Sequence, residues 1–201
     1  MSKARAKSKA MLIDDPRQIR ALVSPIRQEI VDALEAAGPC SIAELATQLG
    51  RPADGLYFHI RRLLKVGLLA EGVERRGVRR PAATYDVAGR PIRIRDRREN
   101  TAATRPVLHA ALRLGARDLT RVMGTADAIT AGPRRNLTGG RVKGWLSRSE
   151  LARANRALDK LLDLLRSGRP GRGRRLQTFA WALAPARPQR PVGNSKNGES
   201  R

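Results

Sequence analysis

The stretch from Ser41 to Leu69, SIAELATQLGRPADGLYFHIRRLLKVGLL, decides the fold. Ser41 and Glu44 have the spacing of a capping box, in which each side chain accepts a hydrogen bond from a backbone N–H at the start of a helix. A first helix is therefore predicted to begin near Ile42. Gly50 is expected to end it, because glycine adopts the left-handed conformation common at helix ends.

A second helix is predicted from Ala53 until Gly67. Its apolar residues recur at the spacing of one helical stripe: Leu56, Ile60, Leu63 and Leu64. The remaining surface carries aromatic and cationic side chains that suit base edges and phosphates: Tyr57, Phe58, His59, Arg61, Arg62 and Lys65. Two helices joined by a tight turn, the second with a free hydrogen-bonding face, are typical of a helix-turn-helix in which the second helix reads DNA.

Two further helices are predicted upstream as a scaffold. The first runs from Pro16 to Val23, and the second begins after Ser24, where Pro25 occupies a first-turn position that needs no N–H. The second helix is expected to bury one apolar face and to end at Gly38.

A β-hairpin is predicted after Gly67, because two extended runs flank the sequence ERRGVRR, in which Gly77 supplies a turn. Arginines crowd its tip: Arg75, Arg76, Arg79 and Arg80. Such side chains can follow a DNA backbone or enter a minor groove, although an ordinary solvent-exposed hairpin has the same composition. A last short strand is predicted between Pro91 and Arg95.

These motifs resemble those of one bacterial family. The run from Arg51 to Leu69, with LYFH, RRL and VGLL, resembles the winged helix-turn-helix domains of ArsR-like transcriptional regulators, and the likeness covers roughly residues 16–95. It implies a mainly α fold with a small β wing, binding to double-stranded DNA, and repression as the default mode. Asp54 and Gly55 stand where Ser, Gln or Thr are common in the family, which bears on sequence specificity more than on binding.

The charge balance points to a polyanionic partner. The chain of 201 residues has 41 Lys and Arg against 18 Asp and Glu, a formal net charge of +23. Basic surfaces gain affinity for nucleic acid by releasing condensed counterions, although a compositional bias towards arginine would also contribute. The sequence has neither an apolar run long enough to span a membrane nor the apolar core of a secretion signal, so a cytoplasmic, nucleoid-associated location is expected.

The second half is predicted to hold a dimerisation unit. A long helix is expected from Thr104, with one apolar face composed of Leu108, Ala111, Leu112, Leu119, Val122 and Met123. This face suits a homodimer interface, and packing on the chain's own C-terminal part is the competing interpretation. Ser147 and Glu150 form a second capping box, followed by a stripe expected to be buried: Leu151, Ala154, Leu158, Leu161, Leu162 and Leu165. Short strands are considered at 141–146 and 176–183.

The predicted organisation has four parts. Residues 1–15 form a flexible basic arm, residues 16–95 the winged helix-turn-helix domain, residues 100–184 a helical dimerisation and C-terminal α+β domain, and residues 185–201 a disordered basic tail.

Chemistry beyond binding has little support in the sequence. The only histidines, His59 and His109, fall in different predicted domains, so no catalytic residues are expected. Cys40 is the only cysteine, and thiophilic metals need more than one soft ligand, so neither a metal nor a cofactor is expected. The aromatic residues Trp145, Phe179 and Trp181 would line an effector pocket or, as the favoured alternative, form a core.

The leading hypothesis is a dimeric, sequence-specific transcriptional regulator. The predicted reader residues are Tyr57, His59, Arg61, Arg62 and Lys65, together with the wing arginines. A nonspecific nucleoid-associated DNA-binding protein is the alternative that the net charge supports, and an RNA-binding protein is a third.

Overall fold

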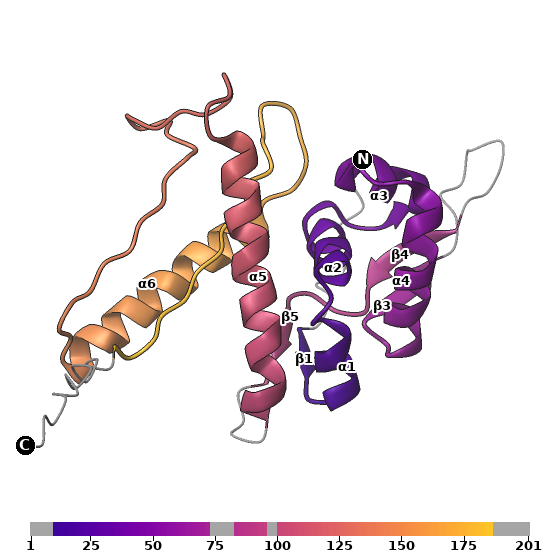
Figure 1. Cartoon of the computed structure of the whole chain (residues 1–201), viewed down its shortest axis with the longest axis horizontal. Helices are drawn as coiled ribbons and strands as arrows, with labels where there is room; N and C mark the ends of the chain where they lie inside the picture. Colours follow the sequence, from indigo (N-terminus) through magenta and orange to yellow (C-terminus); the bar gives the residue numbers. More distant parts are fainter. Residues whose placement is uncertain (1–9, 73–82, 96–99, 187–201) are drawn as a thin grey trace, which may run out of the picture.

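The computed structural model describes residues 10–72, 83–95 and 100–186. These described residues form six helices and five short strands, whose order along the chain Figure 1 shows. The helices are α1 (Pro16–Ala21), α2 (Pro25–Ala37), α3 (Ile42–Leu49), α4 (Ala53–Lys65), α5 (Thr101–Val122) and α6 (Arg148–Ser167). The strands are β1 (Met11–Ile13), β2 (Cys40–Ser41), β3 (Leu69–Gly72), β4 (Thr84–Val87) and β5 (Ile92–Ile94).

The predicted helix-turn-helix is confirmed by α3 and α4. The Glu44 carboxylate accepts a hydrogen bond from the Ser41 N–H at 2.7 Å, and the Ser41 hydroxyl accepts one from the Glu44 N–H at 3.3 Å. Gly50 then takes the left-handed conformation, with φ of 60°. The helices α2, α3 and α4 pack around one core whose largest fully buried side chains are Ile13, Ile19, Ile30, Leu34, Leu45, Leu56, Ile60, Leu63 and Leu68.

The predicted hairpin is confirmed at its two strands. β3 and β4 pair antiparallel with Leu69 opposite Val87, and β2 joins the other side of β4 to make a three-stranded sheet. The tip between them, with the four arginines Arg75, Arg76, Arg79 and Arg80, lies outside the described residues.

Residues 11–13 do not belong to the flexible arm expected over residues 1–15. Met11–Ile13 form β1, which pairs in parallel with β5, and the Met11 N–H donates to the Pro91 carbonyl at 3.0 Å. Ile13 is fully buried. The assignment of residues 11–15 to an arm was wrong because three successive apolar residues find a partner strand at the far end of the domain sequence, in residues 92–94. Residues 1–9 lie outside the described part of the chain.

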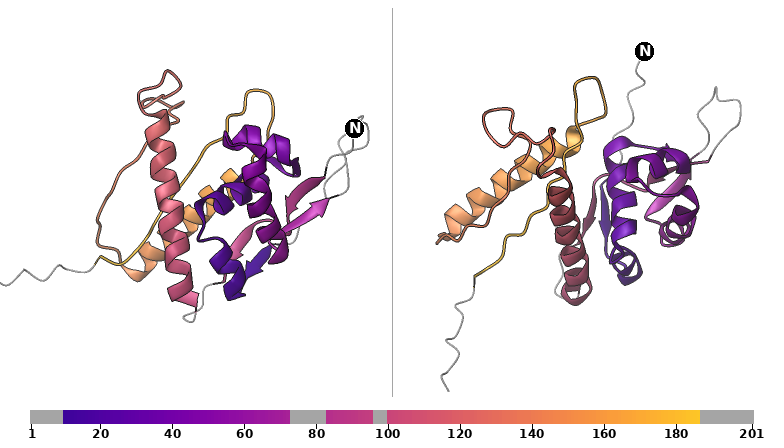
Figure 2. Two further views of the ribbon diagram at one scale, coloured as in Figure 1. Left: turned by 45° about the vertical axis from the view of Figure 1, so that its right-hand side comes forward. Right: turned by 45° about the horizontal axis from the view of Figure 1, so that its top comes forward.

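Helix α5 packs into the core of the N-terminal domain. The domain boundary expected at residue 95 therefore does not separate α5 from the helices that precede it. The helix begins at Thr101, slightly before the predicted start at Thr104, and buries Val107, Ala110 and Leu114 against α1 and α2. The buried amide of Gln28 donates to the carbonyl of Leu22 at 2.6 Å and to that of Val107 at 3.0 Å, which ties α2 to α5. Figure 1 and the right-hand view of Figure 2 show α5 between α6 and the other helices.

The C-terminal part differs most from the prediction. The second capping box is confirmed, with the Glu150 carboxylate 2.8 Å from the Ser147 N–H, but α6 has no buried residue within the described chain. Residues 141–146 and 176–183 have no regular structure, so both considered strands were wrong. An extended segment without a neighbouring strand cannot form the hydrogen bonds of a sheet, even where its apolar and polar residues alternate. None of the helices described is both long and apolar enough to cross a bilayer.

Candidate nucleic-acid interface

Helix α4 divides into a buried and a free face. Leu56, Ile60 and Leu63 point into the core and are at most 1% exposed. The opposite face leaves five side chains exposed, four of which the sequence assigned to the site: Tyr57, Phe58, Arg61, Arg62 and Lys65. Both the exposure and the chemistry of this face therefore suit contact with base edges and phosphates.

Phe58 is a central member of this face that the predicted site had left out. Its side chain is 58% exposed, and the Arg62 guanidinium lies 5.5 Å from its ring centroid, within the range of a cation–π contact. The pairing holds an arginine and an aromatic ring side by side on the free face. The sequence analysis placed Phe58 off the apolar stripe of this helix, and a large aromatic residue in that position was the signal that could have added it to the site.

His59 lies at the side of α4 rather than on its free face. Its Nδ1 atom is buried and has no hydrogen-bond partner among the described residues. Burial lowers the pKa of His59, and the nearby charges of Arg27 and Arg51 lower it further. The lowered pKa favours the neutral imidazole at pH 7. The imidazole lies nearly perpendicular to the Phe58 ring, with 5.4 Å between the ring centroids.

Tyr57 and Arg61 lie on the side of α4 that faces the hairpin. Burial raises the pKa of Tyr85 on β4, the charges of Glu71 and Tyr57 raise it further, and Arg61 opposes them. Tyr85 pairs across the hairpin with Glu71 of β3. Helix α4 also packs against β3, so the side of α4 that carries Tyr57 and Arg61 lies beside the hairpin.

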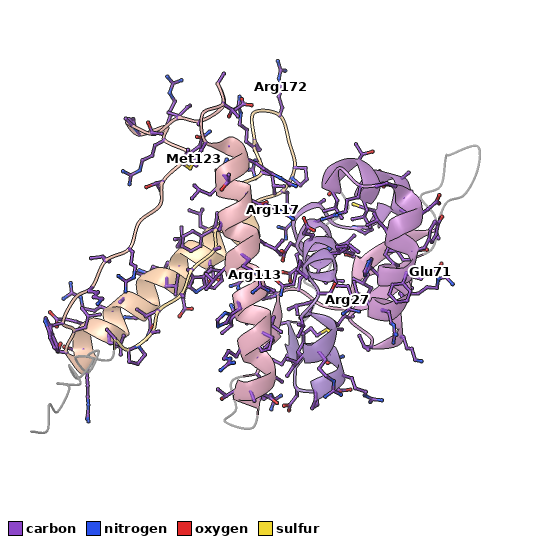
Figure 3. The ribbon with its side chains drawn as sticks, viewed as in Figure 1. Arg27, Glu71, Arg113, Arg117, Met123 and Arg172 are labelled. Atoms are coloured by element: carbon purple, nitrogen blue, oxygen red, sulfur yellow. The ribbon has the colours of Figure 1, made fainter. Side chains whose placement is uncertain are left out.

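Glu29 of α2 connects the turn before α4 to helix α5. Its carboxylate lies 2.8 Å from the Arg51 guanidinium and 2.5 Å from that of Arg117, and the Glu29 side chain is only 10% exposed. Figure 3 shows Arg117 on the side of α5 that faces α2. Burial alone would raise the pKa of Glu29, but the hydrogen bonds from Arg117 and Arg51 outweigh it and the pKa is lowered.

We expect Glu29→Gln to destabilise the protein by about 1–3 kcal/mol at pH 7, between the values for exposed and buried ion pairs. The pKa of Glu29 in the folded protein lies below the usual 4.5. The stabilisation from its ion pairs is therefore complete above about pH 4.5 and is lost as the pH falls through the folded-state pKa. Urea unfolding of both proteins from pH 7 to pH 3 measures it. The control Asp163→Asn removes a 71% exposed carboxylate and should change the free energy of unfolding little. A difference in the free energy of unfolding between Glu29→Gln and wild type that stays constant from pH 7 to pH 3 would contradict the stabilising role of the ionised Glu29 carboxylate.

The aromatic residues of the C-terminal part do not form the expected pocket or core. Trp145 is fully exposed, while Phe179 and Trp181 stack on one another at 5.6 Å and remain 41% and 43% exposed. Cys40 is buried in the N-terminal core. Over the described ranges, no three His, Cys, Asp or Glu residues are grouped so that they could hold a metal ion.

Comparison with known proteins identifies the same segment. Residues 22–72 match the model of a helix-turn-helix domain family. No curated protein matches the chain. Among solved structures, the YusO protein from Bacillus subtilis is similar with 16% identity and a TM-score of 0.32, covering 74% of this chain and 83% of its own. The transcriptional regulator Tm0710 from Thermotoga maritima is similar with 13% identity and a TM-score of 0.33, covering 71% and 76% respectively. With β3 and β4 following α4, residues 22–72 belong to a winged helix-turn-helix domain.

Proposed function

We propose that this protein is a transcriptional regulator that binds double-stranded DNA through α4 and acts as a homodimer. The observation that carries the proposal is the free face of α4, where Arg61, Arg62 and Lys65 are exposed around Phe58 on a helix whose other face is anchored in the core. A helix fixed in this way can enter a major groove without rearranging the domain. The match of residues 22–72 to a helix-turn-helix domain supports the same proposal.

Binding to duplex DNA distinguishes this function from an RNA-binding one. We expect a labelled mixed-sequence DNA duplex to be displaced by unlabelled duplex DNA at a much lower concentration than by single-stranded or double-stranded RNA, because A-form RNA closes its major groove to a helix. Fluorescence anisotropy at one fixed salt concentration measures both competitions. Equal or better competition by RNA would contradict the proposed function.

A second copy of the chain is the proposed partner of the apolar surface on α5 and α6. The outer face of α5 exposes Leu108, Leu112 and Leu119, at 56%, 39% and 37%. Helix α6 adds Leu151, Leu161 and Leu165, each 37–41% exposed. Monomeric proteins rarely leave such rows uncovered. A two-fold dimer through them would bring two α4 helices to two half-sites, as operator symmetry requires. Repression is the mode that the family resemblance favours.

Negative charges introduced into the apolar surface of α5 should dissociate the proposed dimer. We expect the double variant Leu112→Glu/Leu119→Glu to be monomeric in light scattering at a concentration where the wild type is dimeric, since the dimer would bury two carboxylates from each chain without partners. Thr120→Glu adds a negative charge at an exposed position outside the apolar row and should leave the dimer intact. A monomeric wild type, or a dimeric double variant, would remove this surface from the proposal.

A further inference from the structure

A cationic cleft lies beside α4 and overlaps the predicted DNA surface at Arg62 and Lys65. It has a volume of about 490 Å³ and is lined by α1, the start of α2 and the end of α4. Five of its lining side chains are basic and one is acidic: Arg17, Arg20, Arg27, Arg62, Lys65 and Asp15.

The single acidic group is already neutralised. The Asp15 carboxylate caps α1 by accepting a hydrogen bond from the Arg17 N–H at 2.7 Å, and it pairs with the Arg17 guanidinium at 3.1 Å. Arg20, Arg27, Arg62 and Lys65 therefore leave an excess of four positive charges around one cleft. Like charges at this density repel one another unless an anion is bound between them.

Arg27 is the cleft residue whose environment points most directly to an anion. Its Nε atom is buried and has no hydrogen-bond partner among the described residues. Burial lowers the pKa of Arg27, and the neighbouring charge of Arg62 lowers it further. Figure 3 shows Arg27 projecting from α2 towards α4. A buried donor without an acceptor costs free energy, which a bound anion would recover.

Guanidinium groups match phosphate oxygens through paired N–H donors. We propose that the cleft between α1, α2 and α4 binds phosphate, and that the phosphate is supplied by the DNA backbone next to the groove that α4 enters. This step rests on the proposed function. Arg62 and Lys65 belong to both the cleft and the free face of α4, so a duplex held on that face brings a backbone to the cleft. A small polyphosphate is the other source of the same chemistry.

The test compares two pairs of arginines in the full-length protein. Arg20→Ala/Arg27→Ala removes the two cleft cations that lie outside α4 and are not paired with Asp15. Arg153→Ala/Arg156→Ala removes the same charge from an exposed side of α6. Affinity for two duplexes of equal length and unrelated sequence is measured by anisotropy from 50 to 300 mM salt. Removing one cation that neutralises a DNA phosphate lowers the slope of log K against log salt by about 0.9.

We expect the cleft variant to lose affinity by the same factor on both duplexes and to lower the salt slope by about 1–2 relative to the α6 control. Arg20→Glu alone, which changes an exposed side chain, should lower affinity in the same uniform way. Cleft variants with the slope and affinity of the α6 control would overturn the proposal.

A second experiment, with tripolyphosphate in place of DNA, distinguishes failure of the phosphate cleft from failure of the proposed function. If the wild type binds no duplex, the proposed function fails, and thermal unfolding with tripolyphosphate then tests the cleft alone. A rise in the unfolding temperature of the wild type but not of Arg20→Ala/Arg27→Ala would show that the cleft binds free phosphate. Equal shifts in both proteins, or no shift, would overturn the cleft as a phosphate site.

Discussion

Replacing Arg61 and Arg62 by alanine is expected to lower affinity for duplex DNA at least about tenfold, with no change in fold. An arginine at a base edge contributes about 1–3 kcal/mol of discrimination, and a factor of ten in affinity corresponds to about 1.4 kcal/mol. Both side chains are exposed on the free face of α4, so their removal leaves the core intact. Anisotropy titrations at one salt concentration, with thermal unfolding of the same samples, measure both properties.

The control for this variant is Arg153→Ala/Arg156→Ala, which removes the same charge from α6 and should lower affinity far less. A collapse of the thermal midpoint with unchanged DNA binding would mean that Arg61 and Arg62 support the core. An equal decrease of affinity in both double variants would mean that net charge, and not the face of α4, holds the DNA.

Ile60→Ala is expected to give the largest decrease in stability, about 2–5 kcal/mol, because it deletes buried methyl groups and leaves a cavity behind α4. The Ile60 side chain is 1% exposed and lies on the core face of the same helix as Arg61. Small domains have only about 5–15 kcal/mol of total stability, so the urea midpoint should fall markedly.

Phe58→Ala provides the matched comparison on the opposite face. Phe58 is 58% exposed, so its truncation should change stability by less than about 0.5 kcal/mol while weakening DNA binding. The two variants should therefore separate the anchoring and the binding faces of α4. A large decrease in stability in Phe58→Ala, or none in Ile60→Ala, would show that the helix is rotated relative to the structure.

Local signals in the sequence were sufficient to predict the helix-turn-helix. The Ser41–Glu44 capping box, the left-handed Gly50 and the stripe on α4 each depend on residues within a few positions of one another, so the structure confirms them. The phase of that stripe also predicted correctly that Arg61, Arg62 and Lys65 are exposed. Their contact with DNA remains a prediction.

Features that depend on distant residues were not predicted. β1 forms only because β5 lies beside it, and no local signal pairs Met11 with Ile92. Helix α5 is apolar on two sides, and its outer row masked the buried row of Val107, Ala110 and Leu114. The same limit applies to the site, since Arg20 and Arg27 lie on helices assigned to the scaffold and meet Arg62 only in the folded domain.

The C-terminal part shows that an amphipathic pattern does not identify the surface against which a helix packs. The capping box at Ser147 correctly predicted where α6 begins, but its apolar stripe does not reveal whether its partner is the same chain or another. Within the described chain the stripe is not buried, which is why the proposed dimer uses it.

Selection of bound duplexes from a random-sequence library at physiological salt, followed by sequencing, tests the central proposal most directly. Dimeric, sequence-specific binding predicts an enriched palindrome whose half-sites are centred about one helical turn apart. A flat sequence profile with tight binding would contradict it and would favour a nonspecific, nucleoid-associated protein.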